Sequence, residues 1–173
     1  MVLDKYNLSV NYDDGYLEES LLDKFEIEIG YNLPQEYKNI ISQHNSLYLN
    51  EPNFEFINFY NEKDIGACYF YGYGTPTENI TEANTHFEDP EYYGEKGIIT
   101  FGLDANGDNV CFDYRDDLST DNPKIVYVYH DRFEELPDGR VRNVINHVAN
   151  SFEDFLGILF RYEDKYDDYG NPL

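Results

Sequence analysis

The spacing of apolar residues predicts helices towards both ends of the chain and strands between them. From residue 16 to residue 29, leucine, isoleucine and phenylalanine recur every three or four positions, and acids fill most of the rest. This spacing predicts an amphipathic helix with an acidic outer face that ends near Gly30. A second helix is predicted to begin at Leu33-Pro34, because proline loses no hydrogen bond at a first helical position, and to stop at Asn45.

After the second helix the apolar period shortens to two, which is typical of strands with one buried face. The predicted strands span residues 54–57, 67–71, 98–101, 109–114 and 124–130. Residues 61–66 are expected to form a polar turn, and Asn106-Gly107 predicts a tight hairpin because both residues accept a positive φ. Thr77 can cap a short helix over residues 78–87.

The last predicted strand has two different faces, one with Ile125, Tyr127 and Tyr129 and the other with Val126, Val128 and His130. A closing helix is predicted from a cap at Ser151 to Phe160. This order predicts a single α+β domain, with N-terminal helices and a C-terminal helix packed against a mainly antiparallel sheet. Residues 1–15 are expected to form a loose lead-in, residues 16–162 the domain and residues 163–173 an acidic tail.

The charge balance narrows the possible partners. The 173 residues include 35 acids and 12 bases, so the formal net charge is −23. Nucleic acids and anionic membranes attract basic proteins, so direct binding to either is not expected. Hydrophobic residues still make up 41% of the chain and aromatic residues 17%, which favours a folded globular protein over a disordered one.

The sequence predicts a cytoplasmic protein with unreactive thiols. No segment approaches the ~20 apolar residues of a membrane span, and residues 1–7 lack the apolar core of a secretion signal. Cys68 and Cys111 lie in apolar, strand-like stretches without metal-ligand spacing, so we expect buried free thiols. A disulfide is the alternative if their strands are neighbours.

The sequence predicts no metal ion, cofactor or catalytic centre. The segment Asp104-x-Asn106-x-Asp108 begins like a calcium loop, but Asn109 and Arg115 stand where glycine and glutamate are required, so a hairpin turn explains it better. The four histidines lack zinc-site spacing.

A catalytic role for His130-Asp131 is not expected, because neighbouring residues of a strand point to opposite faces. A hydrolase using two carboxylates stays open as an alternative, since 35 acids always allow such a pair.

Four groups of residues together resemble the SUKH superfamily, which holds yeast cell-wall synthesis regulators and bacterial toxin-immunity proteins. They are Leu33-Pro34-Gln35-Glu36-Tyr37 with Asn45, Ile98 to Asp104 with Gly107-Asp108 and Cys111 to Asp113, Pro123 with Ile125-Val126 and Tyr129-His130, and Val148-Ala149 with Ser151 to Leu156. The groups occur in the family's order over about residues 17–160. One departure is that Ser46 and Leu47 follow Asn45, where the family usually has two glycines.

The resemblance implies a protein that acts by binding and has no catalytic centre. In bacteria the implied partner is the toxic domain of a polymorphic secreted toxin, often a nuclease, and the protein would be the cognate immunity protein. An acidic regulatory module that binds proteins other than toxins, like the yeast members, is the alternative. No particular oligomeric state is predicted.

The charge indicates how such a partner would be bound. A nuclease carries a basic groove for phosphates, and an acidic protein would be steered towards it. The candidate contact residues are Asp104, Asp108, Asp113, Asp116, Asp117, Glu163, Asp164, Asp167 and Asp168. For each of them, a merely solvated charge is the alternative. Tyrosines such as Tyr69, Tyr71, Tyr73 and Tyr92-Tyr93 either build sheet faces or contact a partner.

Overall fold

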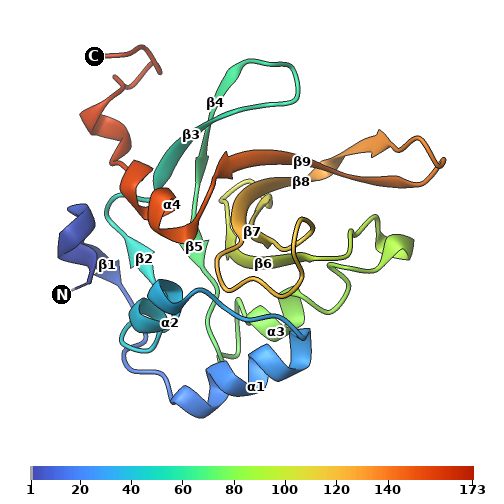
Figure 1. Ribbon diagram of the computed structural model, residues 1–173. Helices are drawn as coiled ribbons and strands as arrows, with labels where there is room; N and C mark the ends of the chain where they lie inside the picture. The colour runs from blue at the N-terminus through green and yellow to red at the C-terminus, as the bar shows by residue number, and fades with distance from the viewer. Residues whose placement is uncertain (1) are drawn as a thin grey trace.

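Within residues 2–173, which the computed structural model describes, three antiparallel sheets and four α-helices are present (Figure 1). The main sheet has the order β5-β6-β7-β8-β9. Its strands are β5 (Tyr69–Phe70), β6 (Ile98–Leu103), β7 (Asn109–Asp113), β8 (Lys124–Glu135) and β9 (Val141–Ala149). The two-stranded sheets pair β1 (Val10–Tyr12) with β2 (Tyr48–Leu49) and β3 (Asn53–Ile57) with β4 (Lys63–Ala67). The predicted α+β class is confirmed.

The helices begin and end close to their predicted signals. They are α1 (Glu19–Ile29), α2 (Gln35–Ile41), α3 (Ile80–Ala83) and α4 (Phe152–Ile158), with 3-10 turns η1 (Leu3–Tyr6), η2 (Pro90–Tyr92) and η3 (Tyr162–Asp164). Gly30 ends α1 in the left-handed conformation that glycine adopts most easily. The side chain of Ser151 accepts a hydrogen bond from the amide of Asp154 and caps α4 as predicted. In α3 the cap is Asn79 instead of Thr77, and the helix is only four residues long.

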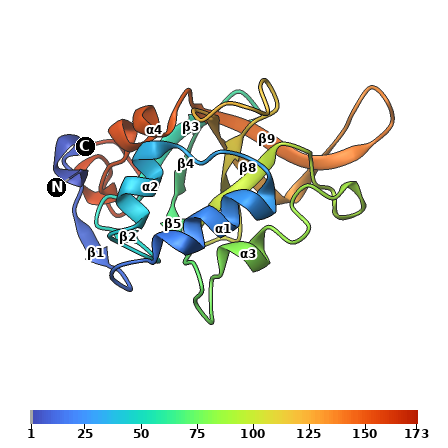
Figure 2. The same cartoon turned by 60° about the horizontal axis from the view of Figure 1, so that its bottom comes forward.

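One face of the main sheet packs against α1, α2 and α4 around Tyr37 (Figure 2). The Tyr37 ring is fully buried and lies 5.2 Å from the Phe112 ring and 5.4 Å from the Phe152 ring, centroid to centroid. Its hydroxyl lies 3.0 Å from that of Tyr73. The leucine-proline-x-x-tyrosine signature is therefore a core motif, since Leu33 is also buried.

The opposite face of the sheet buries a smaller cluster of Ile98, Cys111, Val126 and Val128. The predicted alternation of β8 is confirmed, because Ile125 and Tyr127 belong to the larger core. Cys68 also belongs to the larger core, whereas Cys111 lies in the smaller cluster, and both are free thiols.

The strand prediction was wrong about β9 and about the end of β8. Beyond Val128 the two strands form a ribbon that projects from the body of the protein (Figures 1 and 2). A register shift between Val128 and Phe133 marks where the ribbon leaves the body. With solvent on both faces, the ribbon needs no alternation of apolar and polar residues. The inner half of β9 pairs with Ile125 to Val128 in the body, and its buried positions include the polar residue Asn146, which breaks the apolar alternation.

The predicted turn at residues 61–66 was also wrong, because β4 begins at Lys63. The turn lies earlier, where the side chain of Asn58 accepts hydrogen bonds from the amides of Tyr60 and Glu62. At Cys68 the chain leaves β4, and the amide of Cys68 donates to Pro52. The predicted strand 67–71 is thus divided between two sheets.

Both ends of the chain contact the domain and lie on the same side of it (Figure 1). The lead-in contains η1 and β1, and β1 pairs with β2. In the tail, the hydroxyl of Tyr166 donates to the Glu55 carboxylate at 2.7 Å, and the Lys165 ammonium lies 4.0 Å from the centre of the Phe160 ring. The tail is therefore held against β3.

Candidate partner-binding surface

Two of the nine candidate acids, Asp104 and Asp108, point into the protein. Asp104 is 8% exposed, and one of its oxygens accepts hydrogen bonds from the Ala67 amide at 2.9 Å and the Tyr127 hydroxyl at 2.7 Å. Asp108 is 3% exposed and accepts from the side-chain amide of Asn106 at 2.9 Å. The two carboxylates therefore hold the hairpin turn against its neighbours, and they do not form part of the exposed acidic surface.

Asp108 also holds His130, a contact that the sequence did not indicate. Its second oxygen accepts from the His130 backbone amide at 2.9 Å and lies 2.8 Å from Nδ1 of the ring. Asp108, His130 and Asp131 bring possible metal-ligating atoms within 4.8 Å of one another. Both oxygens of Asp108 already accept hydrogen bonds, so the arrangement is that of a structural pair linking the turn to β8.

The next three candidate acids lie at the end of β7 and in the loop that follows it. Asp113 accepts two hydrogen bonds from the Arg115 guanidinium, at 2.9 and 2.7 Å. Asp116 forms an ion pair with Lys124, whose hydrogen bond lowers the pKa of this carboxyl. A hydrogen bond from the Ser119 hydroxyl likewise lowers the pKa of Asp117. Asp116 and Asp117 face solvent, but nearby cations offset part of the charge of this loop.

The remaining four candidate acids are in the tail. Asp167 folds the tail on itself, because its carboxylate accepts hydrogen bonds from Asn171 that lower the pKa of Asp167. The other three, Glu163, Asp164 and Asp168, are exposed. In both ribbon views the tail lies at the left edge, away from the loop after β7, so the candidates do not form one continuous patch (Figures 1 and 2).

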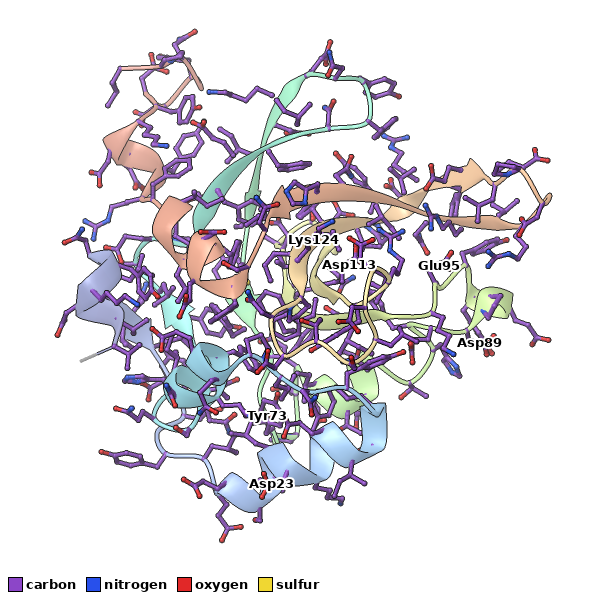
Figure 3. The ribbon with its side chains drawn as sticks, viewed as in Figure 1. Asp23, Tyr73, Asp89, Glu95, Asp113 and Lys124 are labelled. Atoms are coloured by element: carbon purple, nitrogen blue, oxygen red, sulfur yellow. The ribbon has the colours of Figure 1, made fainter. Side chains whose placement is uncertain are left out.

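A further acidic surface lies on α1 and was not among the candidates. Residues 16–30 contain five acids and a single base, Lys24. In the described chain, no lysine or arginine lies within 4.0 Å of the exposed carboxylates Glu18, Glu19, Asp23 and Glu28. Figure 3 shows Asp23 on this helix, on the outside of the protein. The acidic face was predicted, but a charge run alone does not distinguish a contact surface from a solvated one.

Two apolar side chains distinguish this face from an ordinary solvated helix. Ile27 is 83% exposed between two glutamates, and Tyr16 is 89% exposed just before the helix. A large apolar residue gains nothing from contact with water, whereas a mixture of apolar and charged side chains is typical of contact surfaces. In the sequence, the corresponding signal is an isoleucine between two acids that lies outside the apolar spacing of the helix.

The bases of the protein are almost all neutralised locally. Within residues 2–173, every lysine and arginine except Lys24 and Lys96 lies within 4.0 Å of a carboxylate. The surplus acids, with α1 and the tail prominent among them, therefore carry the negative charge of the surface.

The fold and surface define an α+β domain with a layered aromatic core and an acidic exterior. The chain belongs to the SMI1/KNR4 family (SUKH-1), whose family model matches residues 16–158. The expected family is thereby confirmed. Members of this family are generally non-catalytic proteins of the immunity or regulatory type. No curated protein matches the chain, and no helix within residues 2–173 is both long and apolar enough to cross a membrane.

Proposed function

We propose that this protein is a cytoplasmic immunity protein that binds and neutralises a cognate bacterial polymorphic toxin. Membership of the SUKH-1 family supports this role at the level of the class. The observation that carries the proposal for this chain is the set of unpaired carboxylates around an exposed isoleucine on α1. Such a surface suits a protein partner that offers cations and some apolar area.

The partner that fits this charge best is a nuclease domain with a basic groove. At −23, long-range attraction raises the rate of encounter with a cationic surface, and carboxylates can occupy positions that phosphates would otherwise take. The proposed direct contacts are the α1 acids, and the exposed candidates Asp116, Asp117, Glu163, Asp164 and Asp168, on other parts of the surface, add to the long-range attraction. Asp104 and Asp108 contribute indirectly, by holding the turn.

Co-expression tests the function. The genes beside this one are searched for a toxin domain, which is then induced in a bacterial host with and without this protein, and survival is counted. We expect the protein to restore growth, and a catalytically inactive toxin to be retained by the protein in a pull-down. Equal killing with and without the protein would contradict the proposal. If no toxin gene lies beside this gene and the protein instead retains host regulators in the pull-down, the regulatory alternative is supported.

A further inference from the structure

A second surface lies on the opposite face of the main sheet and is built around a cavity of about 220 Å³. Its floor consists of Ile98, Val128 and Ile145, and its walls come from the segment that runs from α3 to the start of β6. An apolar cavity of about 150 Å³ is large enough to bind benzene. This cavity is therefore large enough for one aromatic side chain.

The wall of the cavity presents tyrosines to solvent. Tyr92 stacks on His86 with ring centroids 4.1 Å apart, and Tyr93 lies 4.7 Å from Phe133 of the projecting ribbon. Tyr92 is 57% exposed, Tyr93 47% and Phe133 49%. Tyr92 and Tyr93 line the cavity and Phe133 contacts Tyr93, and exposed aromatic side chains of this kind are common at contact sites.

The backbone of this wall is fixed in a strained conformation. Tyr93 has a φ of 62°, in the left-handed region that an aromatic residue seldom adopts. The loop is closed by a hydrogen bond from the Glu95 amide to Phe87, and a Cβ on Gly94 would lie 2.3 Å from the Phe87 carbonyl oxygen. Strain held by such contacts is typical of functional sites, since it preforms a surface for a ligand.

The charges around the cavity indicate that a bound partner carries positive charge. Residues 78–95 contain six acids and neither lysine nor arginine, and the exposed Lys96 follows them. Glu95, which lines the cavity, is already paired with Arg142 at 3.0 Å and with Arg140 at 3.7 Å, and Figure 3 shows it on the same side of the protein as Asp89. Glu82, which lines the cavity, and Glu91, which adjoins Tyr92, are both exposed, and no cation of the described chain lies within 4.0 Å of them.

We propose that this cavity receives an aromatic side chain of the toxin, flanked in the toxin by lysine or arginine residues that pair with Glu82 and Glu91. This inference rests on the proposed function and adds an apolar anchor to the electrostatic attraction. A buried aromatic anchor with a charged rim is the arrangement that concentrates binding energy in protein interfaces. The partner surface is thus cationic with one protruding ring.

Peptide probes test the chemistry of the cavity without the toxin. The isotope-labelled protein is titrated by NMR with the blocked tripeptides Lys-Phe-Lys, Lys-Ala-Lys and Glu-Phe-Glu. We expect Lys-Phe-Lys to shift the amide signals of Ile98, Val128 and Ile145 and to bind at least about fivefold more tightly than the other two. Equal binding of the three peptides, or shifts confined to other surfaces, would overturn the inference.

Variants link the cavity to the toxin. The double variant Glu82→Gln and Glu91→Gln keeps the fold and should weaken binding of Lys-Phe-Lys and of the toxin domain by about fivefold, the effect of two exposed ion pairs. Tyr93→Ala should weaken both further. The matched control is Tyr60→Ala with Glu62→Gln, which changes an exposed tyrosine and an exposed glutamate on the β3–β4 hairpin.

The outcomes separate this inference from the proposed function. If the wild-type protein neutralises the toxin and the Glu82 and Glu91 variant binds it equally well, the cavity is not the anchor and the immunity role stands. If Lys-Phe-Lys binds the cavity but the protein neither binds nor neutralises the neighbouring toxin, the proposed function fails while the chemistry assigned to the cavity holds.

Discussion

At the scale of single residues, the turn after α2 shows how this chain departs from its family. Asn45 accepts a hydrogen bond from the Tyr73 amide at 2.8 Å and donates one to the Tyr73 carbonyl at 3.1 Å, which fixes the turn to the strand region. The following residue, Ser46, has a φ of 55° and is buried. Ser46 therefore adopts the left-handed backbone conformation that glycine adopts more easily, at a position where the family usually has glycine.

Ser46→Gly should therefore stabilise the protein. Relief of the left-handed strain outweighs the extra freedom of glycine in the unfolded chain, so we expect the free energy of unfolding to rise by about 0.5–1 kcal/mol. Urea denaturation measures this change. Ser42→Gly is the control, because Ser42 has a φ of −59° at the end of α2 and the same substitution should lower stability there. Destabilisation by Ser46→Gly would contradict the assigned conformation.

The hydroxyl pair of Tyr37 and Tyr73 gives a second prediction at this scale. Tyr37→Phe leaves the buried Tyr73 hydroxyl without the partner 3.0 Å away, which should cost about 1–3 kcal/mol of unfolding free energy. Tyr73→Phe should have a similar cost. The double variant should be much less destabilised than the sum of the two, because no unpaired hydroxyl remains. Additive losses in denaturant titrations would show that the hydroxyls do not interact.

At the scale of elements, the tail is held by Glu55 of β3. The Tyr166 hydroxyl, followed by Lys63, lowers the pKa of Glu55 by hydrogen bonding to its carboxylate. A lowered pKa in the folded state means that this contact is fully present above the unfolded value of about 4.3 and is lost as the pH falls through the lowered pKa. The tail is therefore expected to detach in acid.

NMR signals of Tyr166 and Leu173 follow this detachment. Between pH 7 and pH 3 we expect them to move towards unfolded-chain positions as the pH falls through the lowered pKa of Glu55, while the signals of Tyr37 in the core stay in place. In Glu55→Ala they should already be shifted at pH 7. Glu62→Ala, which changes an exposed glutamate of the same hairpin, should leave them unchanged. If the Tyr166 and Leu173 signals shift only at the pH where the Tyr37 signals shift, the tail does not detach separately from the core, which would contradict the role of Glu55.

The elements also show what the sequence can predict. Helices α1, α2 and α4 and strands β3, β5, β6, β7 and the start of β8 were predicted, because each buries apolar residues at a regular spacing. The ribbon of β8 and β9 and the start of β4 were missed, because these segments project into solvent and their pairing leaves no apolar pattern. The inner half of β9 was missed although it is partly buried, because one of its buried positions is the polar residue Asn146. The turn at 104–108 was predicted as a hairpin, whereas the contact between Asp108 and His130 depends on a fold-level approach over 22 residues.

At the scale of the whole molecule, the negative charge is distributed unevenly over the surface. The acids of the turn are buried and most bases are paired, so α1 and the tail contribute prominently to the outward negative field. Counting charges along the sequence identified the surplus. It predicted the acidic face of α1 but did not distinguish it from other acidic segments, because the ion pairs that neutralise those other acids are visible only in three dimensions.

Neutralising α1 should slow association with the toxin. In a variant with Glu18→Gln, Glu19→Gln, Asp23→Asn and Glu28→Gln, we expect the association rate at low salt to fall by about tenfold and its salt dependence to flatten. The control variant removes an equal number of negative charges elsewhere, from hairpin tips and the ribbon, at Glu62, Asp131, Glu135 and Asp138. Equal effects of both variants in stopped-flow measurements would mean that net charge, and not the α1 surface, directs association.

The most direct measurement is the binding of the purified protein to the purified, catalytically inactive toxin domain encoded beside its gene, at about 50 mM and about 500 mM salt. We expect a stable complex at both concentrations, with a dissociation constant in the nanomolar range and an association rate that falls as salt rises. No detectable complex at micromolar concentrations of both proteins would contradict the assignment of this chain as an immunity protein.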